Sequence, residues 1–134
     1  MRFLGIDLGG RRIGLALSDR TNTIAGSLGY VSPRKALEEI LRLVEQEAIT
    51  HIVIGLPLHM NGDKGEGAIK AEEFGESLGA LLPETAILFE DERLTTVTAQ
   101  RVLIEGDLSR KRRKEKVDAL AAALILQKHL DRRK

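Results

Sequence analysis

The sequence has no cysteine, no tryptophan and few aromatic residues, which make up 3% of its 134 positions. The absence of cysteine excludes disulfides, thiol nucleophiles and cysteine-ligated zinc, and it is typical of proteins from a reducing compartment. No apolar run approaches the roughly 18 residues that a membrane span needs, and the chain begins with a strand-like apolar segment rather than a signal peptide. We therefore expect a soluble, cytoplasmic protein with no membrane partner.

Charge is nearly balanced overall but unevenly divided along what the length predicts to be a single domain, residues 1–134. Residues 1–100 carry 10 basic and 15 acidic side chains, whereas residues 101–134 carry 11 basic and 5 acidic ones. Six of these cations fall within seven positions: Arg110, Lys111, Arg112, Arg113, Lys114 and Lys116. This basic run favours an anionic partner such as phosphate, although a solvated loop would have the same composition.

Hydrophobic periodicity predicts alternating strands and helices. The expected strands are 2–8, 13–18, 24–31, 51–55 and 85–89, and the expected helices are 33–48, 68–82, 95–105 and 116–131. The basic run is expected to form a loop between the last two helices. Three antiparallel strands followed by helix-separated parallel strands give an α/β fold, with a mixed five-stranded sheet and helices on both faces. Ligands of such sheets bind where parallel strands end.

Acidic residues stand where apolar ones are expected. Asp7 is the only charged residue in the predicted first strand after position 2, and burying a lone carboxylate is costly unless it is compensated. Asp118 is the only polar side chain in an apolar helical stretch. Glu90, Asp91 and Glu92 follow the fifth strand and repel one another unless a cation is near. Strand alternation points Asp91 away from its two neighbours, so only one subset of the three faces a common site.

Each of these acids also has an ordinary structural interpretation. Asp7 could bond the amides of a glycine turn, Asp118 could interact with a helix dipole, and the acidic triplet could pair with Arg93. If the acids instead converge, oxygen ligands without His or Cys suit hard cations, and we expect Mg²⁺ or Mn²⁺. Such ions activate water and stabilise the departing oxygen in phosphodiester cleavage.

Four motifs in order resemble those of the YqgF family, also called RuvX, over nearly the whole chain. They are Gly5-Ile6-Asp7-Leu8-Gly9, Ile54-Gly55-Leu56-Pro57-Leu58 followed by Asn61-Gly62, Asp91-Glu92-Arg93-Leu94-Thr95-Thr96 and Lys116-Val117-Asp118-Ala119-Leu120-Ala121-Ala122. The resemblance implies a ribonuclease H-like fold and a divalent-metal nuclease. The implied substrates are the 5′ end of the precursor of 16S ribosomal RNA, during ribosome biogenesis, or branched DNA such as a Holliday junction.

The resemblance also assigns roles to residues. Asp7, Glu92 and Asp118 would be the catalytic, metal-binding acids, with Asp91 as an alternate ligand or a supporting acid. Many ribonuclease H-like nucleases gather four carboxylates, and this chain offers three clear ones. His59 stands where the motif leads us to expect Asn. The candidates for nucleic-acid contact are Gly9, Gly10, Arg11, Arg12, His59, Arg93, Thr95, Thr96 and the basic run.

Base stacking is poorly provided for in this composition. The aromatic residues are Tyr30, Phe3, Phe74 and Phe89, and we interpret the phenylalanines as core. Recognition of the nucleic-acid backbone and shape should therefore dominate. A resolvase would favour a two-fold homodimer, but no unpaired apolar stripe indicates one.

Two other functions fit parts of the sequence. Residues 7–14 also resemble the phosphate motif of actin-like ATPases and sugar kinases, which clamp a nucleotide between two such domains. A chain of this length supplies two domains only as a dimer. The second alternative is a nucleic-acid binding module without catalysis, in which the acids balance the basic run.

Overall fold

The computed structural model describes residues 1–9, 11–59, 61–92 and 110–133, and it describes the backbone alone from 110 to 119. One mixed sheet has the strand order β3-β2-β1-β4-β5. The strands are β1 (Phe3–Leu8), β2 (Ile13–Ser18), β3 (Ala25–Val31), β4 (His51–Leu56) and β5 (Ala86–Asp91). β2 pairs antiparallel with β1 and β3, and β4 pairs parallel with β1 and β5. The predicted mixed α/β sheet is confirmed.

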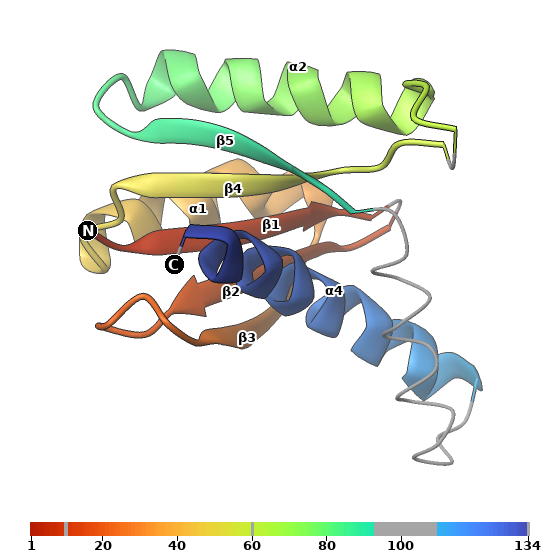
Figure 1. Ribbon diagram of the computed structural model, residues 1–134, viewed down its shortest axis with the longest axis horizontal. Coiled ribbons are helices and arrows are strands. Elements are labelled where there is room, and N and C mark those ends of the chain that lie inside the picture. Colours follow the sequence, from red (N-terminus) through yellow and green to blue (C-terminus); the bar gives the residue numbers. More distant parts are fainter. Residues whose placement is uncertain (10, 60, 93–109, 134) are drawn as a thin grey trace.

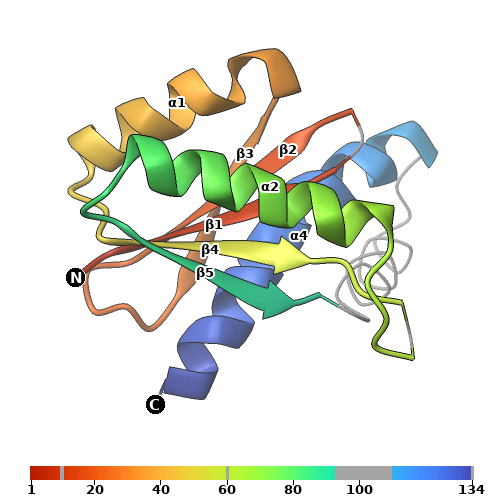
Figure 2. The ribbon, with the colours of Figure 1, turned by 90° about the horizontal axis from the view of Figure 1, so that it is seen from above.

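Helices cover both faces of this sheet (Figures 1 and 2). On one face lie α1 (Pro33–Gln46) and α2 (Glu66–Leu81), and on the other lies α4 (Arg110–Arg133). Pro33 begins α1 because its fixed φ suits the first helical position, where no amide donor is needed. The predicted helix 95–105 lies outside the described residues.

Alternation along the inner strands supplies two cores. Leu4, Ile6 and Ile54 face α1 and α2, whereas Phe3 and Val53 face α4. Both sides of β1 and β4 are therefore apolar, as expected of central parallel strands covered by helices. The two cores fix the positions of the strand ends, where the acidic residues lie.

Small residues bring α4 close to the sheet. A Cβ atom at Gly5 would lie 2.8 Å from Cβ of Leu126 and 3.0 Å from the carbonyl oxygen of Ala122. Farther along, Phe3 contacts the ring of His129 at 5.7 Å between centroids. Residue numbers in α4 thus fall as those in β1 rise, so the two elements run antiparallel.

The structure corrects two expectations about element boundaries. The basic run belongs to α4 rather than to a loop, because the helix already begins at Arg110. The N-terminal part of α4 extends beyond the edge of the sheet at which β1, β4 and β5 end (Figure 1). β5 also continues through Glu90 and Asp91, so the acidic triplet begins inside the strand. None of the helices, within the described ranges, is long and apolar enough to cross a membrane.

Candidate functional site

Asp7 and Glu92 meet at the carboxyl edge of the sheet, although their strands are not neighbours. β4 lies between β1 and β5, and the backbone amide of Glu92 donates at 3.2 Å to the carbonyl oxygen of Leu56, the last residue of β4. The carboxyl groups of Asp7 and Glu92 share a hydrogen bond across this strand. Two of the three acids singled out in the sequence therefore form a pair.

The side chain of Glu92 passes over Gly55 of β4 to reach Asp7. A Cβ atom at this position would overlap Oε2 of Glu92 and would lie 2.5 Å from Cδ1 of Ile125 in α4. The missing side chain leaves the space through which Glu92 reaches toward Asp7. Gly55 belongs to the second of the four motifs, but its steric role was not predictable, because nothing in a single sequence shows which side chain crosses a strand.

The electrostatics of the pair follow from this crowding. Burial raises the pKa of Glu92 to about 8, and the charge of Asp7, the hydrogen bond to Asp7 and the charge of Asp91 add to the rise. Near neutral pH the two carboxyl groups therefore share one proton. A divalent cation between them would remove the same repulsion, so the donor chemistry of the pair fits a hard cation such as Mg²⁺ or Mn²⁺.

The third acid, Asp118, lies on α4 four positions before Ala122, whose carbonyl oxygen approaches Gly5. Positions four apart share a face of a helix, and Asp7 lies two residues beyond Gly5 on the same face of β1. The antiparallel course of α4 and β1 therefore carries the backbone at 118 toward the end of β1. Among the side chains that are described, no three His, Asp or Glu groups form a metal cluster. A third ligand from Asp118 stays a prediction.

Glu90 belongs to a different cluster, although it is two positions from Glu92. Its carboxylate is 2% exposed and accepts a bond of 2.6 Å from the guanidinium of Arg132, and Nδ1 of His129 lies 3.2 Å away. These contacts hold the C-terminal turns of α4 against β5. Glu90 therefore joins the helix to the sheet and lies apart from the acidic pair, in keeping with the expectation that not all three acids face one site.

Asp91 lies near both α4 and the acidic pair. Nζ of Lys128 donates to its backbone oxygen at 2.7 Å, and the charge of its carboxylate contributes to the raised pKa of Glu92. The strand extends through this residue, so its side chain alternates with that of Glu90. Asp91 is therefore near the pair and remains a candidate supporting acid.

The candidates for nucleic-acid contact are distributed over several segments. The amide of Gly9 donates to the backbone oxygen of Asp7 at 3.1 Å, so a main-chain hydrogen bond stabilises the start of the turn after β1. Arg11 is exposed, whereas the guanidinium of Arg12 lies over the ring of Tyr30. The ring of exposed His59 covers Gly65 before α2. Gly10, Arg93, Thr95 and Thr96 lie outside the described residues, as do the side chains of the basic run.

Fold and site together define a ribonuclease H-like protein with an acidic pair at the carboxyl edge of its sheet. A solved structure with this fold, T. thermophilus RuvC in complex with Holliday junction substrate, is 19% identical with a TM-score of 0.52, and the match covers 99% of this chain and 95% of that one. A profile of the RuvX family, described as Holliday junction resolvase, matches residues 1–132. The chain belongs to the RuvX family.

Curated relatives match this chain over nearly its full length. A protein of Latilactobacillus sakei is 42% identical, with 98% of this chain and 93% of that protein covered. A protein of Thermoanaerobacter pseudethanolicus is 46% identical, with 100% and 99% covered. Both carry the name "Putative pre-16S rRNA nuclease". The family resemblance expected from the four motifs is confirmed.

Proposed function

We propose that this protein is a divalent-cation-dependent nuclease that processes the 5′ end of the precursor of 16S ribosomal RNA in the cytoplasm. Membership of the RuvX family and the names of the relatives support this function. The observation that carries it is the pair formed by Asp7 and Glu92, because two carboxyl groups pressed together at a ligand-binding edge favour a cation.

Asp7 and Glu92 would hold the cation, with Asp118 as the third ligand. A bound Mg²⁺ or Mn²⁺ supplies an activated water and stabilises the departing oxygen of the phosphodiester. Glu92 must lose its shared proton before it can serve as a ligand. Gly55 leaves the space that the Glu92 carboxylate occupies over β4, and Cδ1 of Ile125 from α4 borders the same space.

Cations of the basic run would contact phosphates on either side of the cleaved bond. The helix carries this run past the edge of the sheet at which Asp7 and Glu92 lie (Figure 1). A nucleic-acid strand lying along that edge would meet acids at the cleaved phosphate and cations beside it. This division of charge suits hydrolysis of a polyanion, since phosphate contacts provide most of the affinity.

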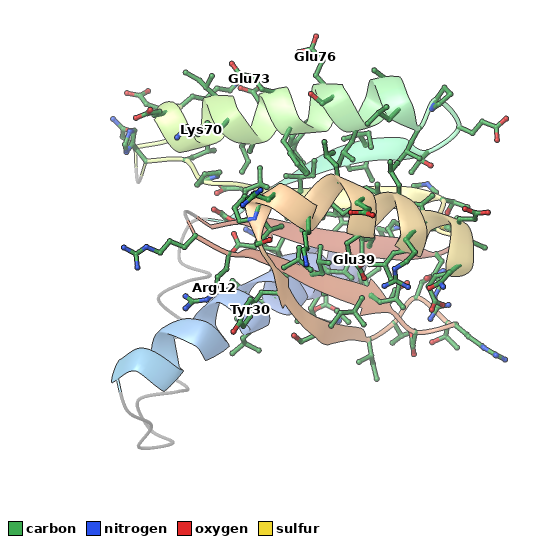
Figure 3. The ribbon with its side chains drawn as sticks, turned by 180° about the vertical axis from the view of Figure 1, so that it is seen from behind. Arg12, Tyr30, Glu39, Lys70, Glu73 and Glu76 are labelled. Carbon is green, nitrogen blue, oxygen red and sulfur yellow. The ribbon has the colours of Figure 1, made fainter. Side chains whose placement is uncertain are left out.

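The test compares cleavage of a precursor 16S leader RNA and of a four-way DNA junction by wild type and Asp7→Asn, with Mg²⁺ present. We expect wild type to cleave the leader and Asp7→Asn to lose cleavage by roughly 100-fold or more while it still binds, because a metal contributes several kcal/mol in the transition state. The control is Glu76→Gln, on α2 and hence on the opposite face of the sheet (Figure 3).

Three outcomes would contradict the proposal in different ways. Equal cleavage by wild type and Asp7→Asn would exclude the acidic pair as the catalytic site. Cleavage of the junction in preference to the leader would assign the activity named for the family, Holliday junction resolution, and a dimer would then be expected. Binding of either substrate without cleavage would indicate a binding module.

A further inference from the structure

Tyr30 of β3 lies in the same row of the sheet as Asp7. Tyr30 pairs with Gly14 of β2, and Gly14 pairs with Asp7 of β1. Residues paired across a ladder point to the same face, so Tyr30 and Asp7 both lie on the face that α4 covers. Two strand spacings separate them, about 10 Å, and the residue between them has no side chain.

A bulge in β3 places Tyr30 on this face. Ala25 contacts the core under α4, so regular alternation would put Tyr30 on the opposite face. The register shifts because Ala16 pairs with Ser27 while Leu15 pairs with Gly29, which adds one residue to β3. Gly29 has φ of 98°, a conformation that glycine adopts without strain. Bulges of this kind often redirect a side chain beside a functional site.

Tyr30 also carries a cation on one face of its ring. The guanidinium carbon of Arg12 lies 5.2 Å from the ring centroid, and the two side chains are next to each other in Figure 3. Tyr30 is nevertheless 45% exposed. The ring is thus held by Arg12 while much of its surface stays in contact with water.

The other aromatic rings are placed differently. Phe3 is 1% exposed, and Phe74 packs against the core under α1 and α2. Phe89 is 38% exposed, but its ring lies against Gly75 of α2, on the face opposite Asp7. The single tyrosine of the chain is therefore the aromatic side chain that combines exposure with the face of the acidic pair.

We infer that Tyr30 and Arg12 form a binding site for an unpaired base of the nucleic-acid strand, close to the phosphate that would be cleaved at the acidic pair. This inference rests on the proposed function. Exposed aromatic rings stack on bases of any sequence, and a stacked arginine adds both a planar surface and donors for phosphate. A stacked strand rises about 3.4 Å per nucleotide, so about 10 Å corresponds to three steps or fewer in an extended strand. The low aromatic content thus does not exclude stacking, because one ring occupies the necessary position.

The chain offers a direct optical test, because it has one tyrosine and no tryptophan. Tyrosine emission of the full-length protein therefore reports on Tyr30 alone. The protein, in EDTA to prevent cleavage, is titrated with a single-stranded RNA oligonucleotide and with an abasic oligonucleotide of equal length. We expect saturable quenching by the RNA and none by the abasic strand. Free tyrosine amide titrated in parallel corrects for absorption by the nucleic acid.

Variants extend the test to affinity, measured by anisotropy of labelled RNA. Tyr30→Ala should weaken binding about 5-fold to 100-fold, as loss of one base–aromatic stack does, whereas Tyr30→Phe and Tyr30→Trp should retain it. The control is Ile69→Ala, since Ile69 is an exposed apolar residue of α2, on the opposite face of the sheet.

Two results would overturn the inference. One is unchanged tyrosine emission at saturating RNA, together with unchanged affinity of Tyr30→Ala. The other is emission that depends on protein concentration rather than on RNA, which would assign Tyr30 to a contact between two copies of the chain. Neither result depends on cleavage, so failure of this inference is distinguishable from failure of the Asp7→Asn experiment.

Discussion

Gly55 and Glu92 are in direct contact, so that a Cβ atom on the glycine would overlap a carboxylate oxygen of the glutamate. The glycine lies in β4, and Glu92 follows β5. The role of Gly55 is steric, because the absence of a side chain leaves the space over β4 through which Glu92 reaches Asp7. Assembly of the acidic pair thus depends on a residue that has no chemistry of its own.

Replacement of this glycine should damage activity more than folding. In Gly55→Ala, Glu92 and Ile125 must both move, and such overpacking typically costs about 1–3 kcal/mol. We expect cleavage to fall by roughly tenfold or more, since small misplacements of catalytic groups are costly. The control is Gly26→Ala, where the nearest atom to the added Cβ is 4.0 Å away. Equal kcat for Gly55→Ala and wild type would show that Glu92 need not lie where the structure places it.

The raised pKa of Glu92 makes stability of the metal-free protein depend on pH. Between the ordinary value of 4.5 and about 8, the folded protein holds a proton that the unfolded chain has lost. The contribution of Glu92 to stability should therefore be fully present below about pH 4.5 and fall as the pH rises toward 8, by a few kcal/mol at most, since one pKa unit is about 1.4 kcal/mol. Thermal unfolding in EDTA, followed by circular dichroism, measures this fall.

Glu92→Gln should flatten this dependence of stability on pH, because the amide cannot ionise. At pH values above 8, added Mg²⁺ should raise the Tm of the wild type, because it binds the folded state. Glu76→Gln, on the far helix, should keep the wild-type profile. If Glu92→Gln keeps it as well, the shared proton is located elsewhere.

The cluster around Glu90 should affect stability rather than catalysis. Glu90→Gln weakens the charge-assisted bonds to Arg132 and His129 at a side chain that is almost fully buried. We expect the free energy of unfolding to fall by about 1–3 kcal/mol. The free energy of unfolding in urea measures this loss. Cleavage per folded molecule should remain as in wild type, and a catalytic loss at full stability would show instead that Glu90 takes part in the site.

Much of the fold was predictable because its signals are local. Short apolar runs on either side of a glycine pair identified β1 and β2, and Pro33 marked the start of α1. The boundary of α4 was missed because charge density was interpreted as a loop signal. Arginine and lysine are good helix formers, and the apolar turns that follow anchor the helix to the sheet.

The site was predictable only in part. An unexpected carboxylate in a strand pointed to Asp7, and the motif pointed to Glu92. Long-range geometry was not readable: the crossing over Gly55, the separation of Glu90 from its neighbours, and the bulge that turns Tyr30 all depend on pairing between distant segments. Such pairing leaves no periodic trace in one sequence.

The basic run should control the salt dependence of binding. Replacing both Arg112 and Arg113 with Ala removes two phosphate contacts, so the slope of log K against log salt concentration should decrease by about 1.4–1.8. Binding isotherms at several salt concentrations give this slope. Lys35→Ala, on α1 at the opposite face, serves as the control and should leave it unchanged. An unchanged slope in the double variant would place the substrate elsewhere.

We propose that Asp7, Glu92 and Asp118 together bind one divalent cation, and calorimetric titration of Mn²⁺ into the metal-free protein tests this proposal most directly. Wild type and Glu76→Gln should bind, whereas Asp7→Asn, Glu92→Gln and Asp118→Asn should each lose most of the affinity. Mn²⁺ binding that is unchanged in all three site variants would contradict the account.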